Sequence, residues 1–312
     1  LLDGAMGTMI QSHHLDEEAY RWQGITAEGS SEILNLTRPE VIAQIHRSYL
    51  EAGADIIETN TFCANRINLL EYGLEDHVAL INRRACRIAR EAAKGSAYVA
   101  GVMGPTNHAL SLASKLEDPA FRRFDFNDFH ASYLEQALLL IEGGVDLFLI
   151  ETVFDTLVAK SAIIAALDAM ERLSVQVPIM VSVTFSDASR RTLSGQSLAS
   201  FIETMAPFPL FSLGLNCSTG PEEMIDLIQE MSETSPFYVS AHPNAGFPDK
   251  EGRYTLTPEA MAATFRPLLQ AGRLNIIGGC CGTTPAHIAA LKEIVGDGRV
   301  HERPTAKRKN VF

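Results

Sequence analysis

The chain has 312 residues, of which 46% are hydrophobic and 21% are charged, as in an ordinary soluble globular protein. Its formal net charge of -12 provides no basic face for phosphates, so nucleic acid is not an expected partner. No apolar run reaches the roughly 18 residues that a membrane-spanning helix needs, so a membrane is not an expected partner either.

Short apolar runs recur along the chain, mostly without polar alternation, which is typical of parallel strands buried on both faces. Helical patterns separate these runs, such as residues 39–53, which begin with a proline and end at a glycine. Thr257 and Thr284, each followed by a proline, are expected to cap the last two helices. The predicted strands are residues 1–6, 55–59, 98–103, 145–151, 179–184, 211–216, 237–241 and 275–279.

Strands that alternate with helices in this way predict a (β/α)8 barrel, the TIM barrel, over residues 1–296. An open doubly wound sheet is the alternative, but no GxGxxG motif follows the first predicted strand. Two polar stretches, 11–38 and 106–127, follow strands and are expected at the C-terminal mouth of the barrel. Residues 297–312 are interpreted as a basic tail or as the start of an interdomain linker.

The five cysteines are too few, and odd in number, for a disulfide scaffold, so a reducing cytoplasm is the expected location. Cys86 falls on the apolar stripe of a helix and is predicted to be a core thiol, while Cys63 follows the second strand. Cys217 follows the sixth predicted strand, and Cys280 and Cys281 follow the eighth. These three sulfurs could therefore meet at the mouth, where three thiolates suit zinc and leave one coordination position open.

The adjacent cysteines at 280 and 281 have other interpretations. Gly278, Gly279 and Gly282 allow a turn tight enough to aim both side chains at one ion, but the turn could also bury two core thiols. A reversible vicinal disulfide in a redox-sensing barrel, or a zinc-storage barrel, is a third possibility. Spacing alone does not decide, because CC is not the CxxC pair of zinc ribbons.

The predicted strand ends carry further polar residues, which is where catalytic groups lie in such barrels. Asp3, Glu58 and Glu151 follow or end the first, second and fourth strands. Their structural alternatives are a loop cap for Asp3, a structural role for Glu58 and an ion pair with a lysine or arginine for Glu151. His242 adjoins the mouth and is a candidate for a supporting position.

Two cysteine motifs, NC at 216–217 and GGCCGT at 278–283, resemble the zinc motifs of the homocysteine S-methyltransferase family. LLDGAMGTMIQ at 1–11 and GADIIETNTF at 53–62 look like the N-terminal homocysteine-binding module of the cobalamin-dependent methionine synthases. The resemblance extends from residue 1 to about residue 296. It implies a methyltransferase with a TIM-barrel fold that acts in methionine biosynthesis and one-carbon metabolism.

The resemblance also implies a catalytic zinc ion (Zn2+) bound by Cys217, Cys280 and Cys281. Asn244 is expected to take the open coordination position when substrate is absent. Zinc would remove the proton of the homocysteine thiol and position its sulfur, and three thiolate ligands would keep that sulfur nucleophilic.

The resemblance further implies a homocysteine site at the ends of the first and fourth strands. Asp3 and Glu151 match the acids that hold the substrate ammonium. Backbone amides around Gly4, Ala5 and Thr152 are the expected partners of the substrate carboxylate.

The methyl donor implied by the N-terminal match is methylcobalamin, carried on a separate corrinoid-binding domain. The chain contains no DxHxxG pattern for binding a corrinoid and has no room for a folate-binding domain. We therefore expect one catalytic module that works with corrinoid-binding and folate-binding domains of a larger enzyme. The alternative is a stand-alone homocysteine methyltransferase that uses S-methylmethionine or another small donor.

Overall fold

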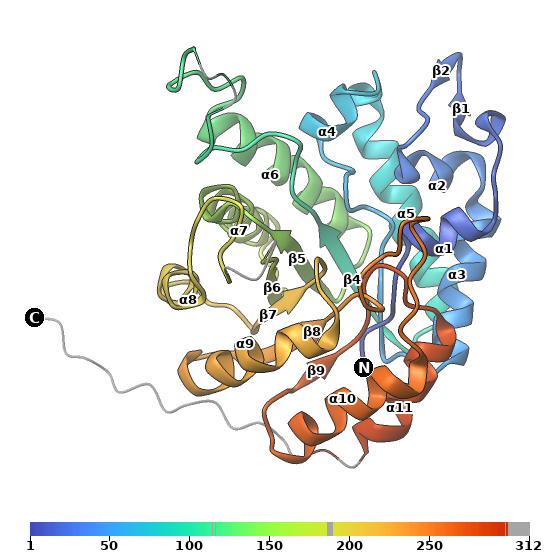
Figure 1. The fold of residues 1–312 in the computed structure, drawn as a ribbon. Coiled ribbons are helices and arrows are strands. Elements are labelled where there is room, and N and C mark those ends of the chain that lie inside the picture. Colours follow the sequence, from blue (N-terminus) through green and yellow to red (C-terminus); the bar gives the residue numbers. More distant parts are fainter. Residues whose placement is uncertain (114, 116, 186–189, 297, 299–312) are drawn as a thin grey trace, which may run out of the picture.

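The computed structural model describes residues 1–113, 115, 117–185, 190–296 and 298. Its centre is a curled parallel sheet with strand order β3-β4-β5-β6-β7-β8-β9 (Figure 1). Consecutive strands are neighbours throughout, which is the connectivity of a (β/α)8 barrel. The strands are β3 (Ile56–Glu58), β4 (Tyr98–Met103), β5 (Leu147–Val153), β6 (Ile179–Val183), β7 (Ser212–Asn216), β8 (Tyr238–His242) and β9 (Ile276–Ile277).

The N-terminal segment closes this sheet. The Leu2 N–H donates to the Ile277 carbonyl at 2.8 Å, and the Asp3 N–H donates to the Ile56 carbonyl at 3.0 Å. The predicted TIM-like barrel is confirmed, but the predicted strand over residues 1–6 is wrong in extent, because only an isolated bridge at Leu2 forms. The chain leaves the sheet at Gly4, where a Cβ would lie 2.7 Å from the Thr283 hydroxyl.

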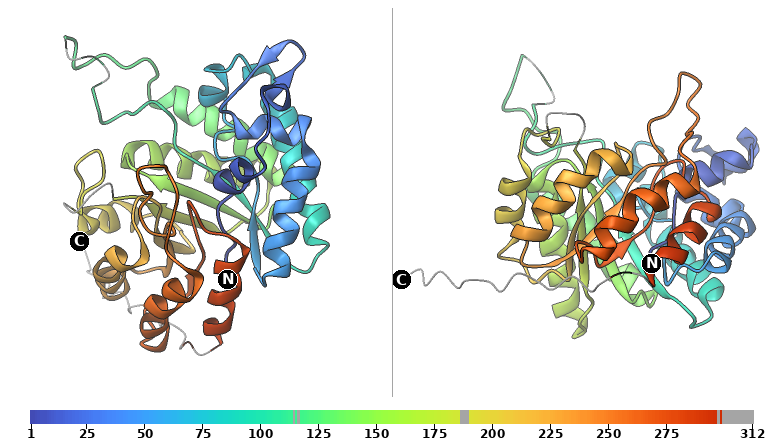
Figure 2. Two further views of the ribbon diagram at one scale, coloured as in Figure 1. Left: turned by 45° about the vertical axis from the view of Figure 1, so that its right-hand side comes forward. Right: turned by 60° about the horizontal axis from the view of Figure 1, so that its bottom comes forward.

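Helices surround the sheet on its outer side (Figures 1 and 2). Helix α8, which lies between β6 and β7, has eight residues and covers only about two turns, so the helical period in its sequence is short. The main helices are α3 (Pro39–Glu51), α5 (Val78–Ala93), α6 (Phe126–Glu142), α7 (Thr156–Leu173), α8 (Leu198–Met205), α9 (Pro221–Thr234), α10 (Pro258–Gln270) and α11 (Pro285–Val295).

The hydrophobic core has two parts. The larger part lies between the sheet and the helices and includes Tyr49, Phe148 and Phe201, all fully buried. The smaller part consists of Leu2, Ala100, Val102, Leu147, Leu149, Met180 and Ile276, contributed by β4, β5, β6, β9 and the N-terminal segment. The residues of a strand alternate between these two parts, so the strands are apolar on both faces, as their sequences predict.

The first polar stretch, residues 11–38, folds into short elements beside the mouth. The hairpin pairs Arg21 with Thr26. The elements in and around this stretch are α1 (Gly7–Ser12), η1 (Glu17–Tyr20), β1 (Arg21–Trp22), β2 (Ile25–Thr26), η2 (Ser31–Ile33) and α2 (Leu34–Thr37), and α4 (Arg66–Leu70) and η3 (Glu75–His77) follow β3.

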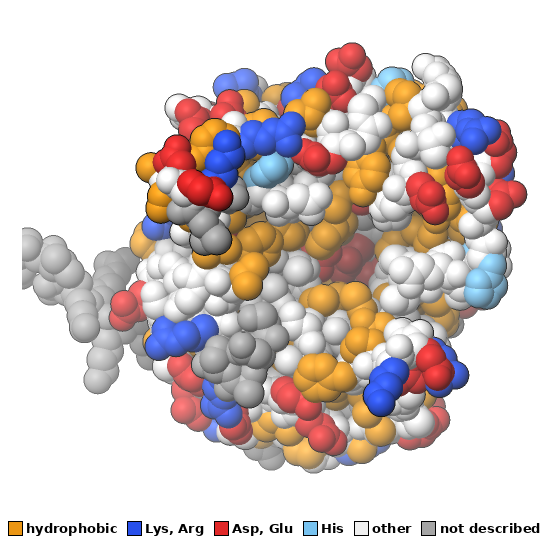
Figure 3. Space-filling model, turned by 45° about the horizontal axis from the view of Figure 1, so that its top comes forward, with side chains coloured by type: hydrophobic (Ala, Val, Ile, Leu, Met, Phe, Trp, Pro, Cys, Tyr) orange, Lys and Arg blue, Asp and Glu red, His pale blue; other side chains and the backbone are white. Residues whose placement is uncertain are grey.

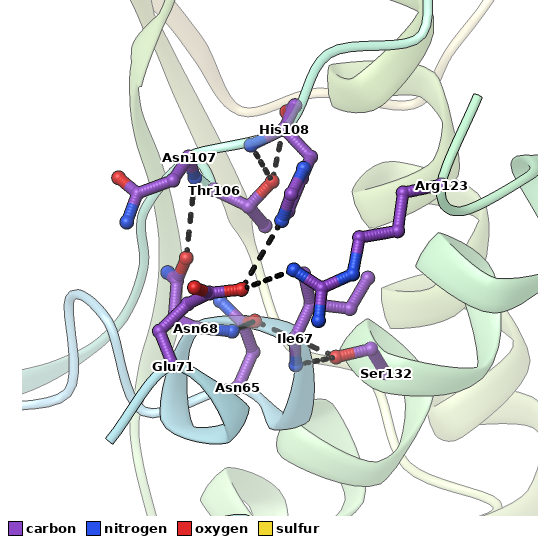
Figure 4. Close-up of polar contacts among 9 residues, drawn as sticks. All are labelled: Asn65, Ile67, Asn68, Glu71, Thr106, Asn107, His108, Arg123 and Ser132. Carbon is purple, nitrogen blue, oxygen red and sulfur yellow. Dashed lines mark hydrogen bonds and ion pairs between the residues drawn. The ribbon is translucent and has the colours of Figure 1, made fainter. Parts of the chain in front are cut away.

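The second polar stretch, residues 106–127, is anchored to α4 and its C-terminal cap residue Glu71 (Figure 4). Arg123 donates to the Glu71 carboxylate at 2.8 Å, and the Asn107 N–H donates to the Asn68 side-chain oxygen at 3.3 Å. The ring of His108 stacks edge-on against Phe124, with centroids 4.9 Å apart. These contacts hold the insertion against the rim of the barrel.

Among the helices of the described ranges, none has both the length and the apolar character needed to cross a bilayer. Thr257 caps α10 as predicted, because its hydroxyl accepts from the Ala260 N–H. The predicted tail or linker over residues 297–312 lies outside the described residues, apart from residue 298.

Candidate active site

A cavity of about 220 Å³ opens at the C-terminal ends of the strands. Figure 3 shows acidic side chains at the floor of a hollow that hydrophobic and uncharged side chains surround. The segment after Asp3, the ends of β3 and β5, and the turns after β7 and β9 all contribute to its wall. The lining includes Gly4, Ala5, Glu58, Glu151, Thr152, Cys217, Cys280 and Cys281.

The thiols of Cys217, Cys280 and Cys281 meet at one side of this cavity. Their sulfur atoms all lie within 4.8 Å of one another, and the sulfurs of Cys217 and Cys281 are 3.9 Å apart. Tetrahedral zinc with Zn–S bonds of about 2.3 Å separates its sulfur ligands by about 3.8 Å. The three cysteines therefore have the spacing of a metal site, and all of them are free thiols.

The backbone around the thiols is tied down by hydrogen bonds between neighbouring strand ends. The Cys217 N–H donates to the His242 carbonyl at 3.0 Å, and the Cys280 N–H donates to the Pro243 carbonyl at 2.8 Å. Cys217 and Ser218 both adopt left-handed backbone conformations, with φ of 62° and 60°. Such conformations are strained for non-glycine residues and persist only where surrounding contacts hold them.

Without a metal, the three thiols share negative charge unequally. Hydrogen bonds from Cys217 and Cys280 lower the pKa of Cys281 to about 3. Its hydrogen bonds with Cys217 and Cys281 raise the pKa of Cys280 well above its usual range. A bound divalent cation would remove this inequality, because its charge favours thiolate on every ligand.

Asn244 lies in the loop after β8, beside the thiols. The next residue, Ala245, donates its N–H to the Cys281 carbonyl at 2.9 Å. Asn244 is only 4% exposed, and its side-chain oxygen has no hydrogen-bond partner within the described ranges. A buried oxygen without a partner is costly unless a ligand satisfies it, so this observation supports Asn244 as a fourth ligand without testing it.

Three carboxyl groups gather at the other side of the cavity, where Glu58 and Glu151 line it and Asp3 is buried next to Glu58. Asp3 accepts a hydrogen bond from the Glu58 N–H at 3.0 Å, and its second oxygen has no partner in the described part of the chain. Burial raises the pKa of Asp3 to about 7 and, together with repulsion from Asp3, the pKa of Glu151 to about 8. Burial and repulsion from Glu151 and Asp3 raise the pKa of Glu58 well above its usual range. Within the described ranges these three carboxyls form no ion pair with a lysine or arginine, and a substrate ammonium would supply a positive charge.

Asn216, the last residue of β7, connects the carboxyl side to the thiol side. Its amide donates to the Glu151 carboxylate at 3.1 Å and to the Thr152 hydroxyl at 2.8 Å. Its oxygen accepts from the Thr152 N–H at 2.9 Å and from the Ser182 hydroxyl at 2.6 Å. Among the described residues, the hydrogen-bond partner of Glu151 is thus the Asn216 amide. The ion pair with a lysine or arginine that was the alternative for Glu151 is not found there.

Asn216 carries no role in the sequence interpretation, although it precedes Cys217 in the NC motif. Its position, at a strand end and next to a predicted metal ligand, is the feature of the sequence that could have indicated a role in the site. Its contacts lie on β5 and β6, and only the register of the sheet shows that they are within its reach.

Two of the amides predicted to hold the substrate carboxylate already have partners. The Ala5 N–H donates to the Thr283 hydroxyl at 3.1 Å, and the Thr152 N–H donates to Asn216. Substrate binding through Gly4, Ala5 and Thr152 stays a prediction, and at Ala5 and Thr152 it requires sharing or exchange of these hydrogen bonds.

The other candidates lie outside the cluster of thiols. Cys86 is fully buried in the core, as predicted. Cys63 donates its N–H to the buried Glu32 carboxylate at 2.8 Å. His242 is 1% exposed, and burial lowers the pKa of its imidazole to about 3, so it is a neutral residue beneath the mouth.

Comparison with known proteins identifies the family. The model of the homocysteine S-methyltransferase family matches residues 1–295. The chain belongs to the homocysteine S-methyltransferase family. It is therefore a methyltransferase, and the family's acceptor is the sulfur of homocysteine.

Solved structures agree with this fold. The metallated form of the homocysteine methyltransferase MmuM from Escherichia coli is 24% identical, with a TM-score of 0.71, and the match covers 94% of this chain and 95% of that one. The oxidized form of MmuM is 22% identical with a TM-score of 0.70, covering 94% of both chains. At this identity the likeness shows a shared fold and does not by itself transfer residue roles.

Proposed function

We propose that Cys217, Cys280 and Cys281 bind one zinc ion and that the homocysteine thiol takes its open position. The observation that carries this proposal is the meeting of three thiols from two strand ends, with 3.9 Å between the sulfurs of Cys217 and Cys281. When bound, zinc supplies a positive charge that converts the substrate thiol to a thiolate at neutral pH.

Glu151 and Asp3 hold the ammonium group of homocysteine in this proposal. Both carboxyls are buried, with exposed fractions of 8% and 1%; burial raises the pKa of both, and the charge of Asp3 adds to the rise at Glu151. An ammonium ion between them would restore their charged forms and satisfy the free oxygen of Asp3. The sulfur and the nitrogen of one substrate molecule would then be fixed at opposite sides of the same cavity.

We infer that the methyl donor is methylcobalamin, presented by a corrinoid-binding domain. The corrinoid would supply the methyl group, and the homocysteine thiolate held at the thiol side of the cavity would accept it, giving methionine. The support is the resemblance of residues 1–11 and 53–62 to the methionine synthase module. Because the cavity opens at the mouth, a large cofactor on a partner domain could approach the sulfur from outside.

A small donor such as S-methylmethionine is the competing proposal, with the barrel acting alone. The match to MmuM favours it, because that homocysteine methyltransferase is covered over 95% of its length by this single barrel.

One experiment separates the two donors and tests the metal. Purified zinc-loaded protein is given homocysteine with methylcobalamin or with S-methylmethionine, and methionine is measured. Methylation from methylcobalamin alone supports the corrinoid proposal, and methylation from S-methylmethionine alone overturns it. Full activity in protein shown to be metal-free would overturn the zinc proposal.

A further inference from the structure

The end of β5 carries an irregularity at the substrate side of the site. Ile150 pairs with Val181, and Val153 pairs with Val183. Between these two pairs β5 therefore contains one residue more than β6. This is a β-bulge, and it contains Glu151 and Thr152. Bulges re-aim side chains and are common beside active sites.

Thr152 holds the bulge in a strained backbone conformation. Its φ is 57°, which is unfavourable for a β-branched residue. Such a conformation persists only where neighbouring groups over-determine it. Asn216 provides this restraint, since it binds both the N–H and the hydroxyl of Thr152.

Every hydrogen-bonding position of the Asn216 amide is filled. Its oxygen accepts two hydrogen bonds and its nitrogen donates two, which is the full capacity of a side-chain amide. The orientation of the amide is thereby fixed, because exchanging oxygen and nitrogen would set N–H groups against the Thr152 N–H. The residue is fully buried, so water does not compete for these bonds.

The same residue is joined by one peptide bond to a proposed metal ligand. Cys217 follows Asn216, and its N–H is held by the His242 carbonyl across the β7–β8 pair. Any shift of Asn216 would therefore move the Glu151 carboxylate and the Cys217 sulfur relative to each other.

We propose that Asn216 is a positioning residue that sets the distance between the ammonium anchor and the sulfur-binding side of the site. This inference rests on the proposed function, because it takes Glu151 as the ammonium anchor and the thiols as the metal site. Homocysteine has one methylene more between nitrogen and sulfur than cysteine. A fixed distance between the two anchors would select the longer amino acid.

The test compares thiols that differ only at the amino group. Asn216→Ser is loaded with zinc, and its binding of homocysteine and of 4-mercaptobutyrate, which lacks the amino group, is measured by calorimetry. We expect homocysteine to bind about 10-fold or more weakly, because a hydrogen bond to a buried carboxylate is lost. Binding of 4-mercaptobutyrate and zinc content should change little, and the preference for homocysteine over cysteine should fall.

Two further variants separate positioning from general damage. Asn68→Ser removes another buried amide, which donates to the Pro105 carbonyl and accepts from the Asn107 N–H at the rim (the latter contact is drawn in Figure 4), and should leave the thiol preference unchanged. Ser182→Ala removes one of the four hydrogen bonds of Asn216 and should show a smaller loss confined to amino thiols. It serves as the test if thermal unfolding shows that Asn216→Ser does not fold.

In a protein that already carries Glu151→Gln, adding Asn216→Ser should cause no further weakening of homocysteine binding, since the two residues act through one contact. Equal weakening for both thiols, or no weakening, would overturn the role of Asn216. If the wild-type protein itself binds neither zinc nor homocysteine, it is the proposed function that fails.

Discussion

The thiol side and the carboxyl side of the cavity differ in how the repulsion among their ionisable groups is relieved. Each gathers three groups that repel one another once ionised, and neither has a lysine or arginine partner among the described residues. The thiols are spaced for a metal ion, which would neutralise them permanently. The carboxyls instead have raised pKa values and keep protons until a cation arrives. A group of thiols spaced for a metal ion and a group of carboxyls suited to a substrate ammonium therefore differ in how their charge is balanced.

The largest effect is expected from removing the metal ligands. Cys280→Ala or Cys281→Ala should lose zinc and reduce methyl transfer by about a hundredfold or more, since losses outside the ligand set alone cost about 10–100-fold. Metal content by mass spectrometry and methionine formation check this. Cys63→Ala is the matched control, because its sulfur is outside the group of three, and it should keep one zinc. Retained zinc in Cys280→Ala would contradict the ligand assignment.

The carboxyl side should respond in substrate binding and not in metal content. Glu151→Gln should weaken homocysteine binding by about 10- to 100-fold, because a charge-assisted hydrogen bond to the ammonium becomes a neutral one. Binding of 4-mercaptobutyrate should be almost unchanged. Titration calorimetry on zinc-loaded protein measures both. An equal loss for the two thiols would show that Glu151 does not bind the amino group.

The raised pKa values predict how stability varies with pH in the metal-free, substrate-free protein. The pKa values of Asp3 and Glu151 are about 7 and about 8 when folded and about 4 when unfolded. Between these values the folded state binds more protons, so stability falls as pH rises from about 4 to about 8. Thermal unfolding across this range should show the decline, and Glu151→Gln should flatten it. A melting temperature that rises steadily through the window would contradict the assignment.

The smallest effect is expected at a strained residue far from both sides. Ser174, the exposed cap residue of α7, has a φ of 54°, close to that of Thr152. Ser174→Gly should stabilise the protein by up to about 1 kcal/mol, because glycine adopts this conformation without strain. Urea unfolding measures the gain, and activity should not change. A loss of stability would indicate that Ser174 makes contacts that offset its strain.

Much of the site follows from positions along the chain. The strand at 98–103 is found as predicted, and five residues expected at strand ends line the cavity: Glu58, Glu151, Cys217, Cys280 and Cys281. The meeting of Cys217 with Cys280 and Cys281 was one of several interpretations of the sequence. It needs β7 and β9 to lie one strand apart, which the order of the sheet confirms.

Other features could not be obtained in this way. The predicted first strand forms only a bridge at Leu2. The length of an apolar run does not reveal how many of its residues will pair in a sheet. The bulge at Glu151 depends on a shift in register between β5 and β6, and an apolar strand sequence carries no sign of it. The contacts of Asn216 depend in turn on that bulge.

The sequence by itself determined the alternation of strands and helices and the kinds of groups at the strand ends, because these depend on local periodicity and position. The tertiary structure alone decided which of those groups touch. Distances such as the 3.9 Å between two sulfurs and the 3.1 Å from Asn216 to Glu151 arise from strand order, register and backbone strain. These properties belong to the closed sheet and to no single segment of the chain.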